Sequence, residues 1–105
     1  MQIQVSVLQG DYPSDVRERI EAKLGGLTRF YSRIISMRAL VECTAEEHRV
    51  ELIAHVGNGN PLITDCRGET FGATLDEAVD RMVRVLKRRS EKLKIERRRV
   101  ARVRH

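Results

Sequence analysis

The chain is 105 residues long, of which 41% are hydrophobic and 33% charged, and its formal net charge is +5. This length corresponds to one domain with enough apolar residues for a single packed core. No apolar run approaches the roughly 20 residues that cross a bilayer, and residues 1–10 lack the charged start of a signal peptide. The composition therefore argues against a membrane protein, a disulfide-stapled miniprotein and a disordered chain.

The first third of the chain predicts a strand followed by a helix. Polar and apolar residues alternate over residues 2–8, which is typical of a half-buried strand. Apolar residues then recur at spacings of 4, 4, 3 and 4, which predicts a helix over about residues 14–32. Gly25-Gly26 lies inside it and weakens it locally. The apolar positions of this helix are Val16, Ile20, Leu24, Leu27 and Tyr31.

Three more strands are predicted in the middle of the chain. Alternation over residues 35–44 directs Ile35, Met37, Ala39, Val41 and Cys43 to the core, and alternation continues over 49–56 and 62–66. The segment 57–60, Gly-Asn-Gly-Asn, predicts a hairpin turn between the last two of these strands.

A long helix is predicted at the end of the chain, from about residue 70 to the mid-90s. Residues 96–105 are basic and poor in apolar side chains, so we expect a tail that frays without a partner. The predicted organisation is one domain over 1–95 and a flexible basic tail over 96–105. The apolar stripe of the helix comprises Phe71, Leu75, Ala78, Val79, Met82, Leu86 and Leu93.

The resulting order, β-α-β-β-β-α, predicts an α+β two-layer sandwich. The first helix acts as a crossover, so strands 1 and 2 are expected to be parallel neighbours, followed by a meander of strands 2, 3 and 4. Two amphipathic helices then cover one face of a four-stranded sheet, and the other face is polar and wet.

The net charge conceals an asymmetry along the chain. Residues 81–105 contain 12 Lys or Arg and two acids, a net charge of +10, whereas residues 1–80 contain eight basic residues and 13 acids, a net charge of −5. A strongly basic end of this kind indicates a polyanionic partner.

The basic residues of the last helix gather on the side away from its apolar stripe. At 100° per residue, Arg81, Arg84, Arg88 and Lys92 lie between about 180° and 260° from Leu75. We call these four residues the basic ridge. Lys87 and Lys94 flank it on one side and Arg89 on the other. A solvated helix face is the alternative interpretation, but few acidic neighbours compensate the ridge, so we predict that a polyanion does.

Nucleic-acid recognition is predicted to rely on phosphates and shape. Aromatic residues make up only 4% of the chain, and none falls on a predicted strand, so a base-stacking sheet is not expected. Lys23 lies at the edge of the apolar stripe of the first helix, where a snorkelling lysine is the plain interpretation. Arg29 and Arg33 add positive charge at the end of that helix.

No catalytic set emerges from the sequence. Cys43 and Cys66 are expected on strands 2 and 4 as buried reduced thiols, with a disulfide, a metal site or a Cys–His nucleophile as weaker alternatives. Asp76 and Asp80 could form a carboxylate pair for acid/base work on the last helix, but we favour helix salt bridges, Glu77–Arg81 and Asp80–Arg84. We expect no enzyme activity, cofactor, metal or small-molecule substrate.

The pattern resembles the ribosome hibernation promoting factors, which include ribosome-associated inhibitor A and the older sigma-54 modulation proteins. The resemblance covers roughly residues 1–95. Its motifs, in chain order, are MQIQV at the start, Ala22-Lys23-Leu24 with Leu27 and Tyr31, His55-Val56 with the Gly/Asn turn, Leu75-Asp76, Asp80-Arg81-Met82 with Arg84, and Lys92-Leu93-Lys94.

The resemblance implies a fold similar to double-stranded RNA-binding domains and a cytoplasmic protein without a membrane partner. It implies binding to rRNA of the small ribosomal subunit in the channel of messenger and transfer RNA, translation inhibition, and preservation of idle ribosomes in stationary phase or stress. The alternative is a regulatory protein-interaction module that modulates the transcription machinery. From the charge pattern and the resemblance together, the expected rRNA-binding residues are Lys23, Arg81, Arg84, Lys87, Arg88, Arg89, Lys92 and Lys94.

Overall fold

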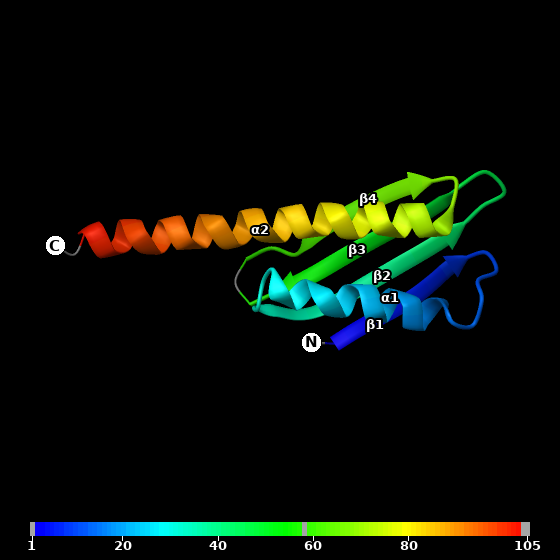
Figure 1. Cartoon of the computed structure of the whole chain (residues 1–105), viewed down its shortest axis with the longest axis horizontal. Helices are drawn as coiled ribbons and strands as arrows, with labels where there is room; N and C mark the ends of the chain where they lie inside the picture. The colour runs from blue at the N-terminus through cyan, green and yellow to red at the C-terminus, as the bar shows by residue number, and fades with distance from the viewer. Residues whose placement is uncertain (1, 58, 104–105) are drawn as a thin grey trace.

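The computed structural model describes residues 2–57 and 59–103, and its elements follow the predicted order (Figure 1). A one-turn 3₁₀ segment, η1, continues the first helix. The elements are β1 (Gln2–Gln9), α1 (Val16–Gly25), η1 (Gly26–Arg29), β2 (Ile34–Cys43), β3 (His48–Val56), β4 (Leu62–Gly68) and α2 (Phe71–Val103).

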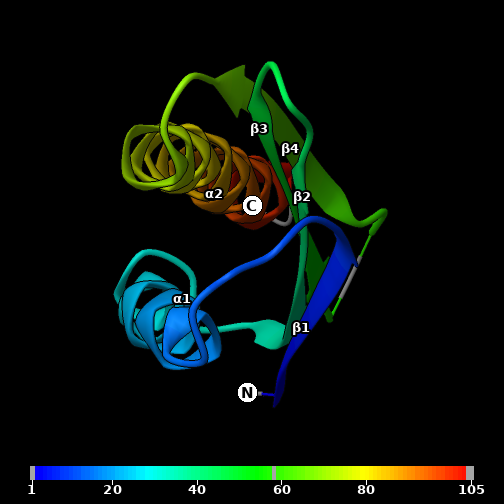
Figure 2. The same cartoon turned by 90° about the vertical axis from the view of Figure 1, so that its right-hand side faces the viewer.

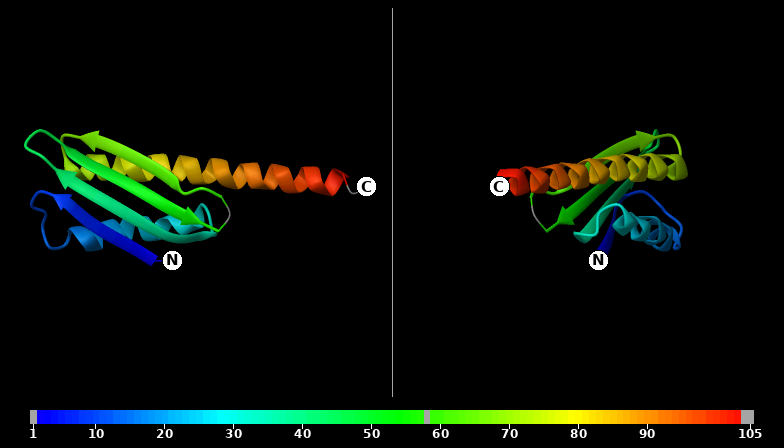
Figure 3. Two further views of the ribbon diagram at one scale, coloured as in Figure 1. Left: turned by 180° about the vertical axis from the view of Figure 1, so that it is seen from behind. Right: turned by 60° about the vertical axis from the view of Figure 1, so that its left-hand side comes forward.

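The four strands form one mixed sheet in the order β1-β2-β3-β4. β1 pairs parallel with β2, while β2–β3 and β3–β4 are antiparallel, as the crossover and meander predicted. Figure 2 shows α1 and α2 side by side on one face of the sheet. Figure 3 shows the other face, which no helix covers. The α+β two-layer prediction is confirmed, whereas the likeness to double-stranded RNA-binding domains stays a prediction.

The core lies between the sheet and the two helices. Alternate residues of the strands point into it, because successive side chains in a strand face opposite ways. Val50, Leu52 and Ala54 of β3 are fully buried, and they meet Leu75 and Met82 of α2, which are at most 1% exposed. α2 packs on β3 and β4, so the sheet side of this helix is fixed and its outer side is free to carry charge.

The first helix differs from the prediction in its ends and its type. The α-helix begins at Val16 and ends at Gly25, and the chain tightens into the 3₁₀ segment rather than continuing as α-helix towards residue 32. Two adjacent glycines favour this change because glycine is a poor helix former. The apolar stripe nevertheless stays in phase, since Leu27 and Tyr31 are buried beside the residues of α1.

The start of β2 also differs from the prediction. Ile34 is buried and Ile35 is 61% exposed, the reverse of the expected orientation. An irregularity between Ile34 and Ser36 shifts the pairing with β3, and such a bulge turns the preceding side chain to the other face. From Met37 onwards the predicted alternation holds, apart from Cys43 at the end of the strand, which is only half-buried.

α2 extends to Val103, about two turns past the predicted end in the mid-90s. Residues 104–105 of the expected tail lie outside the described residues, and the flexibility of the segment 96–105 stays a prediction. In the described part of the chain no helix has the length and apolar character needed to cross a membrane.

Candidate nucleic-acid interface

The basic ridge lies on the solvent side of α2 because the opposite side is anchored in the core. Ala78, Met82 and Leu86 are fully buried against the sheet. Helical geometry then places residues between these positions on the outer surface. All four ridge residues, Arg81, Arg84, Arg88 and Lys92, are exposed, as predicted.

The ridge borders the edge of the sheet at β4. Arg81, Arg84 and Arg88 line a shallow groove of about 360 Å³ together with Ile63 and other residues of β4. Arg81 donates a hydrogen bond of 2.8 Å from Nη2 to Glu77 Oε1, the predicted helix salt bridge. No described carboxylate lies within 4.0 Å of Arg84, Arg88 or Lys92, so these three cations are available to a partner.

The flanking residues are held in three different ways. The Lys87 ammonium lies 5.0 Å from the centre of the Phe30 ring, a cation–π contact that joins α2 to the chain after η1. Arg89 is half-buried and approaches Gly59 in the turn between β3 and β4. Lys94 is exposed and faces the segment after η1.

Lys23 is separated from most of the ridge. It projects from α1 and forms an ion pair with Asp76 near the start of α2, and both side chains are about half exposed. Sixteen residues separate Asp76 from Lys92, about 24 Å along the helix axis. Lys23 therefore stands beside the first turns of α2, where the pairing with Asp76 tethers α1 to α2.

A second group of cations lies where η1 meets the later turns of α2. Arg29 and Arg33 line the same cleft as Lys94, with Ser90 beside them. The sequence signalled positive charge at Arg29 and Arg33 through their place at a helix end. Nothing in the sequence indicated that these two arginines line one cleft with Lys94, because about 60 residues separate the two segments.

The acidic residues of the body are partly neutralised on the uncovered face of the sheet. Arg49 donates to both carboxylate oxygens of Asp65, at 3.0 Å and 2.8 Å, and to Glu51 at 3.0 Å. The hydrogen bond from Arg49 lowers the pKa of Asp65, and the same bond raises the pKa of Arg49. Asp65 also lines the groove beside Arg81, Arg84 and Arg88, so the acidic face and the basic ridge adjoin at β4.

The cysteines do not form a site. Both are free thiols. Cys66 is buried, and burial raises its pKa, which keeps it protonated. Cys43 lies 3.8 Å from His48 Nε2, and the Tyr12 hydroxyl lies 3.2 Å from His48 Nδ1. This cluster packs on Phe71 at the start of α2, away from the ridge. Within the described residues no group of three or more His, Cys, Asp or Glu side chains is placed to hold a metal.

Comparisons with known proteins agree with this architecture. Two solved structures share the fold. The first is the crystal structure of the Thermus thermophilus Protein Y N-terminal domain, with a TM-score of 0.72, 21% identity, and coverage of 84% of this chain and 98% of that one. The second is a ribosomal subunit interface protein from Coxiella burnetii, with a TM-score of 0.78, 16% identity, and coverage of 87% and 99%.

Curated relatives match at the level of sequence. A ribosome hibernation promoting factor of Azotobacter vinelandii is 28% identical over 92 residues, covering 88% of this chain and 85% of the relative. The protein of that name from Escherichia coli K12 is 24% identical over 94 residues, covering 90% and 98%. The model of the family described as Sigma 54 modulation protein / S30EA ribosomal protein matches residues 3–94. Because this match spans most of the chain, the protein belongs to the Sigma 54 modulation protein / S30EA ribosomal protein family.

Proposed function

We propose that this protein is a ribosome-associated hibernation factor. It acts in the cytoplasm without enzymatic turnover, binds rRNA of the small subunit in the channel of messenger and transfer RNA, inhibits translation and preserves idle ribosomes under stress. The family membership and the names of the curated relatives support the association with ribosomes. The exposed positive charges of α2 support the contact with rRNA.

The observation that carries the proposal is the set of exposed cations on a rigid helix. Arg84, Arg88 and Lys92 have no described carboxylate within 4.0 Å, although acids are abundant elsewhere in the chain. Phosphates of RNA supply the missing countercharge, and binding is driven by the release of the counterions that the RNA had condensed. A ridge along one helix is suited to follow a phosphate backbone rather than to read bases.

Occupation of the RNA channel inhibits translation without any chemical reaction. Phosphate contacts fix the position of a protein on RNA, and a body seated in the channel excludes the RNAs that translation requires. On the uncovered sheet face one arginine, Arg49, pairs with three acids and leaves that face acidic, so RNA approaches α2 rather than the sheet.

The test is co-sedimentation of the protein with ribosomes. The triple variant Arg84→Glu, Arg88→Glu and Lys92→Glu is expected to leave the ribosomal fractions at salt concentrations where the wild type remains bound. Since all three side chains are exposed, the thermal midpoint of the variant should stay close to that of the wild type. A control variant with three charge reversals on other surfaces is expected to remain bound. Its substitutions are Arg17→Glu, Arg38→Glu and Arg67→Glu.

Binding should also fall steeply with salt. Each neutralised phosphate contributes a slope of about −0.7 to −0.9 in log K against log salt. Three lost contacts therefore flatten the slope by about 2 to 3. Absence of the wild type from ribosomal fractions at low salt contradicts the proposal. Recovery of one protein partner without rRNA would instead favour the regulatory protein-interaction module.

A further inference from the structure

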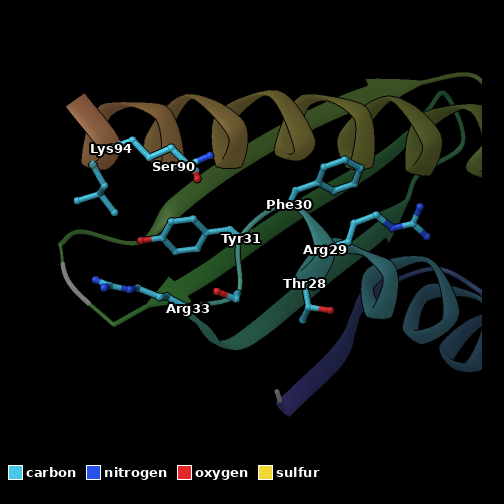
Figure 4. Close-up of a pocket in the computed structure, with 9 residues that line it drawn as sticks. Thr28, Arg29, Phe30, Tyr31, Arg33, Ser90 and Lys94 are labelled. Atoms are coloured by element: carbon cyan, nitrogen blue, oxygen red, sulfur yellow. The ribbon is translucent and has the colours of Figure 1, made fainter. Parts of the chain in front are cut away.

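A cleft opens where the chain after η1 meets the later turns of α2. Its volume is about 350 Å³, at the small end of the range of ligand sites. Figure 4 shows α2 forming one wall, with Tyr31 and Arg33 opposite. The residues that line it are Thr28, Arg29, Phe30, Tyr31, Ser32, Arg33, Ser90, Leu93 and Lys94.

The polar lining of the cleft is suited to an anion. Arg33 and Lys94 line the cleft from two different segments, whereas Figure 4 shows the Arg29 side chain pointing away from both; no carboxylate is among the described residues that line the cleft. Hydroxyl groups of Ser32 and Ser90 add donors. Arginine and lysine facing the same space favour phosphate, because N–H donors that carry charge form the strongest hydrogen bonds with it.

The end of a helix also attracts cations, which offers another reason for some of this charge. Arg29 does serve that end, since its Nε donates to the Gly26 carbonyl at 3.2 Å. Lys94 is not explained this way, because it belongs to α2 and lies opposite the end of η1. Attraction of cations to a helix end therefore does not explain why basic residues of both segments line one cleft.

Tyr31 supplies an independent observation. Its side chain is 5% exposed, and its hydroxyl is buried without a hydrogen-bond partner among the described residues. Buried polar atoms without a partner are rare in folded proteins, because each one costs free energy. In Figure 4 the ring lies between α2 and Arg33, with its hydroxyl on the same side as the Arg33 guanidinium. An oxygen of a ligand beside Arg33 would give this hydroxyl the missing partner.

We propose that the cleft binds a phosphate group of a nucleotide. Arg33 and Lys94 oppose its charge, while the hydroxyls of Tyr31 and Ser90 donate to its oxygens. Phe30 gives the cleft part of its apolar lining. The nucleotide is either a residue of RNA or a free mononucleotide, and in the first case the inference rests on the proposed function.

The first arm of the test uses the free protein and no ribosome. Inorganic pyrophosphate and adenosine monophosphate are titrated at low salt, and amide NMR shifts at Ser90, Leu93 and Lys94 report binding. The wild type is expected to saturate. Tyr31→Phe is expected to bind roughly 2- to 10-fold more weakly, the effect of one hydrogen bond. It should fold at least as stably, because it removes a buried hydroxyl without a partner.

Two matched controls accompany this arm. Tyr12→Phe removes the other tyrosine hydroxyl, which contacts His48 and does not line the cleft, and it should bind as the wild type does. Lys94→Gln should weaken binding, whereas Arg38→Gln removes an exposed cation from the uncovered sheet face and should not.

The second arm uses ribosome co-sedimentation and identifies RNA as the source of the phosphate. If the cleft holds an RNA phosphate, Tyr31→Phe lowers the affinity roughly 2- to 10-fold relative to Tyr12→Phe, and Lys94→Gln flattens the salt slope by about 1. If the wild type fails to bind ribosomes, the proposed function fails and the first arm alone decides on the cleft. The proposal is overturned if neither arm distinguishes Tyr31→Phe from Tyr12→Phe.

Discussion

Arg49 organises the uncovered face of the sheet. Its guanidinium bonds both oxygens of Asp65 and one of Glu51, and lies 3.9 Å from Glu42, so one cation from β3 holds acids of three strands. Cross-strand pairs of opposite charge stabilise a sheet modestly. The network places one guanidinium among three carboxylates, so this face stays acidic, in contrast to the basic ridge.

Asp65 should make stability depend on pH. Its pKa is lowered in the folded protein, so its contribution is fully present above its ordinary value of 3.8 and is lost as the pH falls through the folded value. Asp65→Asn is therefore expected to lower the free energy of unfolding at pH 7 by a few tenths to about 1 kcal/mol, since solvent screens this part-exposed pair. Urea unfolding at pH 7 and at pH 2.5 measures the difference, which should shrink at the lower pH.

Asp11→Asn is the control for this experiment, because Asp11 is exposed and no ion pair within 4.0 Å involves it among the described residues. It should change stability little at either pH. If Asp65→Asn lowers the free energy of unfolding as much at pH 2.5 as at pH 7, the carboxylate charge is not the cause of the loss.

The ion pair between Lys23 and Asp76 makes a separate prediction about binding. Lys23 is expected to contact rRNA, yet Asp76 holds it in the free protein. Asp76→Asn releases the lysine and removes a negative charge from α2, so ribosome binding should tighten and its salt slope should steepen. The free energy of unfolding should fall by less than about 1 kcal/mol, because both partners are about half exposed. Co-sedimentation across a salt series measures the first effect. Unchanged affinity would indicate that Lys23 lies outside the interface.

Among the secondary-structure elements, the sequence predicted the strands and helices well where periodicity alone determines them. The apolar stripe of α2 keeps the helical period from Leu75 to Leu93, so a rotation of 100° per residue correctly predicted which side of the helix carries the ridge. The bulge at Ile35 could not be predicted, because it depends on how β2 pairs with β3. Gly25-Gly26 indicated a weak point in the first helix but not the change to 3₁₀ geometry. The cleft between Tyr31 and Lys94 could not be predicted either, because only the folded chain brings those two segments together.

Gly25 offers a prediction about the first helix. Its φ of −58° is helical, and a Cβ built on it would meet nothing within 4 Å. Gly25→Ala should therefore raise the free energy of unfolding by roughly 0.5–1 kcal/mol, because alanine loses less backbone entropy on folding. Urea unfolding measures the gain.

Gly10 is the opposing control. Its φ is +100°, and a Cβ there would lie 2.7 Å from Cys43 Cβ and 2.8 Å from the Cys43 carbonyl oxygen. Gly10→Ala should destabilise the protein by more than Gly25→Ala stabilises it, since both strain and a clash with backbone oppose it. A loss of stability in Gly25→Ala would mean that the junction between α1 and η1 needs glycine.

At the scale of the whole molecule, the basic residues are concentrated on α2, the element that also makes the molecule elongated. The radius of gyration is 16.0 Å and the longest extent is 60 Å, whereas a compact domain of this length has a radius of about 13 Å. The excess comes from α2, which projects beyond the sheet (Figure 1). Residues 81–105 carry a net charge of +10, so the basic part of the chain begins over β4 and continues along the projecting part of α2, an asymmetry of the kind that steers polyanions to one end of a protein.

The projecting end of α2 should be the first site of proteolysis. Leu93 is the last residue of α2 that packs against the core in the part of the chain that the structure describes, and Ile95 is 50% exposed. A short helical stretch without packing is marginal in water. Limited trypsin digestion should therefore cut first within residues 97–102, well before Arg38 and Arg67 in the strands, and mass spectrometry identifies the products. Bound ribosomes should slow this cleavage, because RNA contacts order and cover a basic segment. Cleavage that begins in the body, or a tail as resistant as the strands, contradicts the prediction.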